Sequence, residues 1–164
     1  MMKAWEAYMT PGDAHKTMAG MVGSWETVIT NYMDPAQPAE EKGSSVFSME
    51  MGGRYIIEKA EGNFMGMPFQ GMGVHGYDNA LKKYVSTWID NMGTGIMTST
   101  GSSTDGGKTI NFSGMNVDPM SGKEQGHRSV MHMMSADQYH FEMYGPGMDG
   151  KEMKLFEITY NRKK

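Results

Sequence analysis

Hydrophobic and polar residues alternate with a period of two along most of the chain beyond Gly23. In the first such stretch Trp25, Thr27 and Ile29 share one face, and the residues between them share the other. Successive side chains of a β-strand point to opposite faces, so this alternation predicts strands that are buried on one side only. The same period returns in about ten short stretches along the chain. The pattern therefore indicates a protein built almost entirely from strands.

Turn-forming sequences rich in Asp, Asn, Gly and Pro separate these stretches, as in hairpin loops. They lie at residues 34–38, 78–79, 105–107, 118–122 and 145–150. No stretch offers the long helix that a crossover between parallel strands requires. An antiparallel meander of this length keeps two exposed edges unless it closes on itself, so the sequence predicts an all-β, antiparallel up-and-down barrel. The alternation changes phase once, between Leu155 and Phe156, which predicts a β-bulge.

A short helix is expected ahead of the first strand. Thr10 supplies a capping hydroxyl and Pro11 suits the first helical position. The helix would stop near Gly20 or Gly23, because glycine commonly ends a helix. It is too short to be stable alone and needs support from the rest of the fold.

A helix followed by Gly23-Ser24-Trp25 and a strand resembles the opening of lipocalin-like barrels. The resemblance implies structural roles: Trp25 would plug the closed end, and Gly23 would let the chain pass close to its neighbours. It also implies an arginine packed on the indole ring, either Arg162 or Arg128. We therefore expect a helical segment at residues 1–22 and a lipocalin-like barrel of about ten strands at residues 23–164, within a single domain.

Methionine makes up 21 of the 164 residues, and cysteine is absent. A thioether fills irregular apolar space and can bind a soft metal such as Cu(I), but it supplies no proton and is a poor nucleophile. This composition favours binding over acid–base or covalent catalysis, and it excludes disulfides and cysteine-based zinc sites. Filling of the barrel is the preferred explanation for methionines in strands. The alternative is methionine-based Cu(I) binding or oxidant scavenging, with Met131, Met133 and His127 as the metal ligands.

About half of the methionines fall outside the predicted strands, where core packing explains them poorly. They include Met65, Met67, Met92, Met120 and Met148. If these sulfurs gather at one mouth of the barrel, they mark a site. If they scatter, the excess reflects composition alone.

The charge and hydropathy of the chain argue against nucleic acid as a partner and against a membrane-spanning helix. The net charge is −4 and the isoelectric point about 5.7, so nucleic acid is not an expected partner. No apolar stretch approaches the ~20 residues of a membrane-spanning helix.

Residues 71–76 match the G-x-G-x-x-G pattern of dinucleotide sites, but they lie within an alternating strand, where glycine marks a bend or close packing. No cofactor is therefore expected.

Aromatic, methionine and charged residues at alternating strand positions indicate a lined cavity. We expect it to bind a small apolar or amphipathic ligand without catalysis. The expected ligand-binding residues are Met49, Met51, Tyr77, Trp88, Asp90 and Arg128. Arg128 would hold a polar head group or form a structural pair with a carboxylate, because an unpaired buried charge is costly. The alternative is a barrel enzyme that uses Asp90, His75 and a glutamate for acid–base chemistry.

Several runs of sequence resemble an uncharacterised bacterial family, domain of unknown function 1579. The matching runs are residues 5–12, 23–25, 52–55, 63–69, 76–79, 86–95, 150–152 and 157–160. The resemblance covers essentially the whole chain and implies a lipocalin-like β-barrel, but no activity. Many relatives look exported, whereas Met1 to Glu6 lacks the apolar stretch of a secretory signal. Both an internal and a periplasmic location therefore stay open, as does a homo-oligomer.

Overall fold

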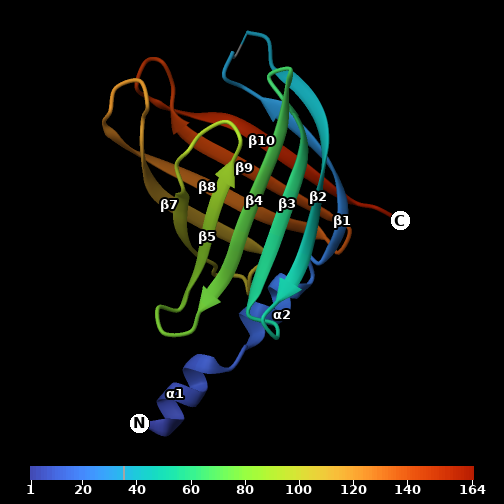
Figure 1. Cartoon of the computed structure of the whole chain (residues 1–164), viewed down its shortest axis with the longest axis vertical. Coiled ribbons are helices and arrows are strands. Elements are labelled where there is room, and N and C mark those ends of the chain that lie inside the picture. The colour runs from blue at the N-terminus through green and yellow to red at the C-terminus, as the bar shows by residue number, and fades with distance from the viewer. Residues whose placement is uncertain (35) are drawn as a thin grey trace.

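The computed structural model describes residues 1–34 and 36–164, in which ten strands close into one barrel (Figure 1). Two helices come first, α1 (Met2–Met9) and α2 (Asp13–Ala19). The strands are β1 (Gly23–Asn31), β2 (Ala39–Glu50), β3 (Tyr55–Phe64), β4 (Met67–Asp78), β5 (Lys83–Asp90), β6 (Met97–Ser102), β7 (Thr109–Val117), β8 (Glu124–Ser135), β9 (Gln138–Pro146) and β10 (Glu152–Arg162). Neighbours pair antiparallel in chain order, and β1 closes the barrel on β10. The predicted fold class is confirmed. Pro35, part of the predicted break after β1, lies outside the described residues.

The predicted bulge is present in β10. Lys154 pairs with Tyr144 of β9 and Phe156 pairs with Met143, so Leu155 is the extra residue on the bulged strand. Beyond the bulge, every second side chain of β10 lines the barrel interior, beginning with Phe156. The irregularity therefore sets which residues of the last strand face inward.

The two ends of the barrel differ. β1 starts directly after α2, so odd-numbered strands run away from the helices and even-numbered strands run back towards them. α2 lies against one end, which we call the closed end, and α1 projects away from it (Figure 1). The loops after β1, β3, β5, β7 and β9 surround the other end, which we call the open end. Neither described helix has the length and apolar character needed to cross a membrane.

Trp25 fills the closed end. Its side chain is fully buried, and the Tyr139 ring meets it edge-on at a centroid distance of 5.2 Å. The Arg162 guanidinium lies 4.1 Å from the centre of the indole ring, a cation–π contact. Gly23 has a φ of +131°, and a Cβ there would lie 2.8 Å from Arg162 Nη1, so only glycine fits. This packing supports the structural roles expected for Gly23 and Trp25, with Arg162 and not Arg128 on the ring.

The N-terminal segment differs from its predicted form, because it contains two helices instead of one. The Thr10 hydroxyl does not cap α2; it donates to the Glu6 carbonyl at 2.7 Å, at the end of α1. α2 begins at Asp13, after Gly12 as the N-cap residue. The Gly12 N–H donates to His15 Nδ1 at 3.0 Å, so the imidazole, and not the Thr10 hydroxyl, satisfies a backbone donor at the start of the helix.

Candidate functional site

A cavity of about 260 Å³ lies inside the barrel. Its lining reaches from Met18 of α2, at the closed end, to Met92 in the loop after β5, at the open end. Aromatic rings dominate the lining: Phe47, Phe64, Phe69, Tyr84, Trp88, Phe112, Phe141, Phe156 and Tyr160. A largely apolar cavity with a few polar groups is the usual form of a small-molecule site.

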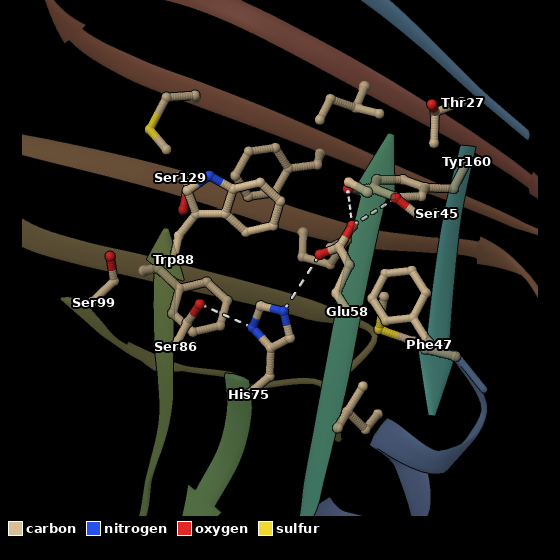
Figure 2. Close-up of a pocket in the computed structure, with 18 of the residues that line it drawn as sticks. Thr27, Ser45, Phe47, Glu58, His75, Ser86, Trp88, Ser99, Ser129 and Tyr160 are labelled. Carbon is tan, nitrogen blue, oxygen red and sulfur yellow. Dashed lines mark hydrogen bonds and ion pairs between the residues drawn. The ribbon is translucent and has the colours of Figure 1, made fainter. Parts of the chain in front are cut away.

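Glu58 places a carboxylate in this cavity. The residue is only 4% exposed, and its inward position follows from the alternation of β3. Ser45 Oγ donates to Glu58 Oε1 at 2.9 Å, and the Tyr160 hydroxyl donates to the same oxygen at 3.2 Å (Figure 2). Burial and the neighbouring Glu58 charge raise the pKa of Tyr160 well above its usual range. The phenol therefore stays protonated and remains a donor.

His75 lies beside the other oxygen of Glu58. Its Nε2 is 3.4 Å from Glu58 Oε2, and its Nδ1 is 2.9 Å from Ser86 Oγ (Figure 2). His75 and Ser86 are direct partners across β4 and β5. The Nε2 atom is buried, and no described residue meets it with hydrogen-bond geometry. A polar atom in this state is available to a molecule that enters the cavity.

A second imidazole–hydroxyl pair, His127 and Ser99, lies further around the barrel from His75 and Ser86. Ser99 is the direct partner of Ser86 across β5 and β6, and its Oγ lies 2.8 Å from His127 Nε2. Burial lowers the pKa of His127, so this imidazole is neutral near pH 7. A band of polar side chains therefore crosses the apolar interior. We call it the polar belt, and it comprises Ser45, Glu58, His75, Ser86, Ser99, His127 and Tyr160.

Glu58, His75 and Ser86 follow the order of a hydrolytic triad, with a carboxylate, an imidazole and a hydroxyl in sequence. Ser86 lies in the middle of β5, where backbone N–H groups are committed to the ladders with β4 and β6. A serine hydrolase also needs free donors at the position of the developing oxyanion. The arrangement therefore suits binding through hydrogen bonds better than acyl transfer.

Trp88 forms the wall of the cavity towards the open end. Its ring stacks on Phe69 with 6.4 Å between centroids and 13° between planes, and its Nε1 donates to Asp90 Oδ2 at 2.9 Å. The indole lies flat over two glycines of β4, because a Cβ at Gly71 would collide with it and one at Gly73 would lie 3.1 Å from it. The first two glycines of the G-x-G-x-x-G match therefore make room for an aromatic wall.

Only some of the residues predicted to line the cavity do so in the structure. Trp88 and Asp90 do line it. Met49 and Tyr77 are partly buried and pack against the core; the Tyr77 ring meets Tyr84 at 5.0 Å, at the closed end. Met51 was wrong as a lining residue, because it is 73% exposed in the turn after β2 with a φ of +51°.

Arg128 was wrong as a polar anchor inside the barrel. It lies on the outer face of β8, between His127 and Ser129, which face inward and are buried. Its Nη2 is 2.8 Å from Glu152 Oε1, and its guanidinium lies 3.8 Å from the centre of the Tyr144 ring. The alternative of a structural Arg128–carboxylate pair holds, but the pair is on the surface. The charged side chain buried inside the barrel is instead the carboxylate of Glu58, which was not among the predicted site residues.

Neither alternative site from the sequence converges on one point. Both nitrogens of His127 already face polar partners, Ser99 Oγ and, at 3.4 Å, Asn116 Oδ1. Met131 lies four residues further along β8, about 13 Å away at 3.3 Å per residue, and Met133 lies further still. These three therefore cannot bind one Cu(I) ion together. Asp90 lies four residues along β5 from Ser86, the partner of His75, so Asp90 does not join His75 in one group. The glutamate of that alternative is present, because Glu58 lies 3.4 Å from His75.

Methionines gather around the open end. Each of its five loops carries an exposed methionine, and we call this set the methionine rim: Met33, Met65, Met92, Met120 and Met148. Met67, at the start of β4, is also exposed at this end. Other exposed methionines lie elsewhere, such as Met51 and Met134. The loop methionines therefore gather at the open end, where Met92 also lines the cavity, but the exposed methionines of the described chain do not all lie there.

A charged cluster occupies the outer face of β9 and β10. Lys154 Nζ lies 3.2 Å from Glu142 Oε1 and 2.7 Å from Glu157 Oε2. His140 joins the two glutamates in a group whose potential ligand atoms lie within 4.8 Å of one another. Hydrogen bonding from Tyr144 and then Lys154 lowers the pKa of Glu142, and hydrogen bonding from Lys154 lowers the pKa of Glu157. The lysine ammonium therefore lies between the two glutamates of this potential metal-ligand group.

Comparison with known proteins identifies the fold and the family. The sequence profile of the family described as "Protein of unknown function (DUF1579)" matches residues 10–162. Rv2717c from M. tuberculosis aligns with a TM-score of 0.67 and 15% identity over 94% of this chain and 100% of that chain. The S-type phycobiliprotein lyase CPES from Guillardia theta aligns with a TM-score of 0.61 and 12% identity over 100% of this chain and 98% of that chain. At such identities the likeness shows the lipocalin-like fold alone. None of the curated proteins compared with the chain matches it in sequence.

Proposed function

Because the chain belongs to DUF1579, a family of proteins of unknown function, its role has to be inferred from its own cavity, and we propose that the barrel binds a small amphipathic ligand. The observation that carries this proposal is an apolar cavity of about 260 Å³ crossed by the polar belt. The aromatic and methionine lining would hold the apolar body of the ligand. The belt would hold its polar group.

The cost of the polar belt supports this proposal. A buried carboxylate such as Glu58 is expensive to keep away from water, and an apolar side chain would stabilise an empty barrel better. Residues that lower stability in this way occur mainly at functional sites, where they serve the function. The buried Nε2 of His75, which no described residue satisfies, fits the same interpretation.

Native mass spectrometry of the protein purified from its own host tests the proposal. We expect an additional mass that organic extraction releases and that a cavity-filling variant loses. Ala60 lines the cavity, so Ala60→Phe should abolish retention, and Ala39→Phe is the matched control because Ala39 is exposed at the start of β2. A bare protein mass, together with no saturable binding of a test amphiphile such as octanol, would overturn the proposal. If Ala60→Phe does not fold, Met131→Trp fills the same cavity from β8.

The methionine rim favours oxidant scavenging as a second candidate function. Its five sulfur-bearing side chains are exposed, on loops outside the strand ladders. Conversion of an exposed methionine to its sulfoxide disturbs no core packing and is enzymatically reversible. Such a protein could consume oxidant without unfolding.

A further inference from the structure

We propose that the ligand is a cation, a protonated amine carried on an apolar body, with its ammonium group held at Glu58. This inference rests on the proposed binding function and specifies the chemical class of the ligand. It follows from three properties of the cavity: its charge, the direction of its hydrogen bonds and its aromatic lining.

The first property is the sign of the charge. Among the described residues that line the cavity, Glu58, Glu61 and Asp90 are acidic, and none is lysine or arginine. Glu61 is exposed, so Glu58 and Asp90 dominate inside. Arg128 on β8 and Lys154 on β10 pair with glutamates on the outer face. A carboxylate ligand would meet like charge in a poorly solvated space, whereas an ammonium group would complete an ion pair.

The second property is the direction of the hydrogen bonds in the polar belt. Nδ1 of neutral His127 faces the acceptor Asn116 Oδ1, so we assign the proton to Nδ1 and the acceptor role to Nε2. The Ser99 hydroxyl then donates to His127. By the same logic, a proton on His75 Nε2 faces Glu58, and the Ser86 hydroxyl donates to His75 Nδ1.

This assignment leaves the belt with several acceptors and one donor that no described residue satisfies, the Nε2–H of His75 beside Glu58. Glu58 Oε1 already accepts from Ser45 and Tyr160, but Oε2 has no closer partner than His75 at 3.4 Å. The Ser86 oxygen, which contacts the same imidazole, keeps unused lone pairs. An ammonium group carries three donors and no acceptor, which complements this arrangement. A carboxylate or phosphate group could accept only from His75 Nε2–H and would otherwise bring acceptors to acceptors.

The third property is the aromatic lining. Phe69 and Trp88 stack on one wall, and Phe141 and Phe156 lie 6.1 Å apart on another. Aromatic faces attract cations, and the attraction grows when water is excluded. The lining would thus tolerate an ammonium group better than a carboxylate, while the area of its rings would hold the apolar body.

Isothermal titration calorimetry with three probes of equal chain length tests the inference. Octylamine, octanol and octanoate carry a positive, a neutral and a negative head group at about pH 7. We expect octylamine to bind at least tenfold more tightly than octanol, and octanoate more weakly than either. Equal or tighter binding of octanol or octanoate would overturn the cation but leave the binding function standing. If none of the three binds, both proposals fail.

A matched pair of variants locates the head group. Glu58→Gln keeps a carbonyl oxygen that can accept from Ser45 and Tyr160 but removes the charge. It should remove the tenfold preference for octylamine while leaving octanol affinity within twofold. Glu26→Gln changes a carboxylate on the exposed face of β1 and should leave the preference intact. An unchanged preference in a folded Glu58→Gln protein, judged by its melting curve, would overturn the assignment of Glu58. The wild-type series does not depend on the variant and decides the ligand class even if the variant fails to fold.

Discussion

Glu58 Oε2 and His75 Nε2 lie 3.4 Å apart inside the barrel, on the neighbouring strands β3 and β4. In a barrel with a purely apolar interior, hydrocarbon side chains would occupy these two positions. Ser45 and Tyr160 hold the carboxylate from one side, and Ser86 holds the imidazole from the other. The polar groups are therefore fixed in place without a ligand, which would lower the cost of binding the proposed one.

The hydrogen bond from Tyr160 to Glu58 should contribute measurably to stability. Tyr160→Phe leaves a buried carboxylate oxygen with one donor fewer, so we expect a loss of about 1–3 kcal/mol in the free energy of unfolding. Urea denaturation followed by circular dichroism measures it. Tyr55→Phe is the control, because Tyr55 is exposed on β3. Equal losses in the two variants would show that the phenol does not support Glu58.

Gly71 should be required for the aromatic wall. Gly71→Ala places a methyl group against the Trp88 ring, so the indole must move into the cavity or the strand must shift, at a cost of about 1–3 kcal/mol. We expect lower ligand affinity and a changed Trp88 environment by NMR. Gly93→Ala is the control, since a Cβ there meets no described atom within 4 Å. An unaltered indole signal in Gly71→Ala would contradict this account of the glycines.

Lys154 should hold the outer-face carboxylates together in a pH-dependent way. The folded-state pKa values of Glu142 and Glu157 are lowered, so their contribution is present above about pH 4.3, the usual glutamate value, and is lost as pH falls through the lowered values. Lys154→Met should therefore destabilise by about 1–2 kcal/mol near pH 7 and by less below about pH 4. Melting temperatures across this range measure the difference. A loss that is independent of pH would contradict the role of the lysine.

The Lys154→Met variant also tests whether the Lys154 ammonium prevents a metal ion from binding to His140, Glu142 and Glu157. With Lys154 removed, His140, Glu142 and Glu157 keep ligand atoms within 4.8 Å of one another. Zn²⁺ should then raise the melting temperature of Lys154→Met and leave the wild-type protein unchanged. Lys59→Met, on the exposed face of β3, should not respond. A wild-type response equal to that of Lys154→Met would show that the lysine does not block the site.

The methionine rim should oxidise before the core. Under dilute hydrogen peroxide, peptide mapping by mass spectrometry should find sulfoxide first at the rim, where Met120 and Met148 are almost fully exposed. Met18 and Met143 are buried and should react last. The melting temperature should stay nearly constant while only the rim is modified. Early unfolding at this stage would remove support for the scavenging function.

The barrel could be predicted from the sequence, because the patterns that indicate it involve only residues close together in the chain. The alternation, the turns and the bulge at Leu155 all follow from nearby sequence. Glu58 was missed because its partner Tyr160 lies 102 positions away, and no local pattern reports that contact. Its inward phase was visible in the alternation of Ile56, Glu58 and Ala60, but an isolated glutamate in a strand usually faces solvent.

The errors at Arg128 and Met51 have the same physical origin. A shift of one residue in the phase of a strand reverses every inward assignment. Arg128 lies between two inward neighbours, so it faces outward. Met51 lies just past the end of β2, in a turn, where the alternation no longer applies. Phase and strand ends are fixed by pairing in the closed barrel, which is a property of the whole chain.

A crystal structure of the protein with octylamine tests the central claim most directly. We predict the alkyl chain inside the barrel, against Trp88 and Phe69, with its nitrogen about 3 Å from Glu58 Oε2. The same soak of Glu58→Gln should show the nitrogen displaced or absent. An amine bound only outside the barrel, or inside it with its nitrogen directed away from Glu58, would contradict the account.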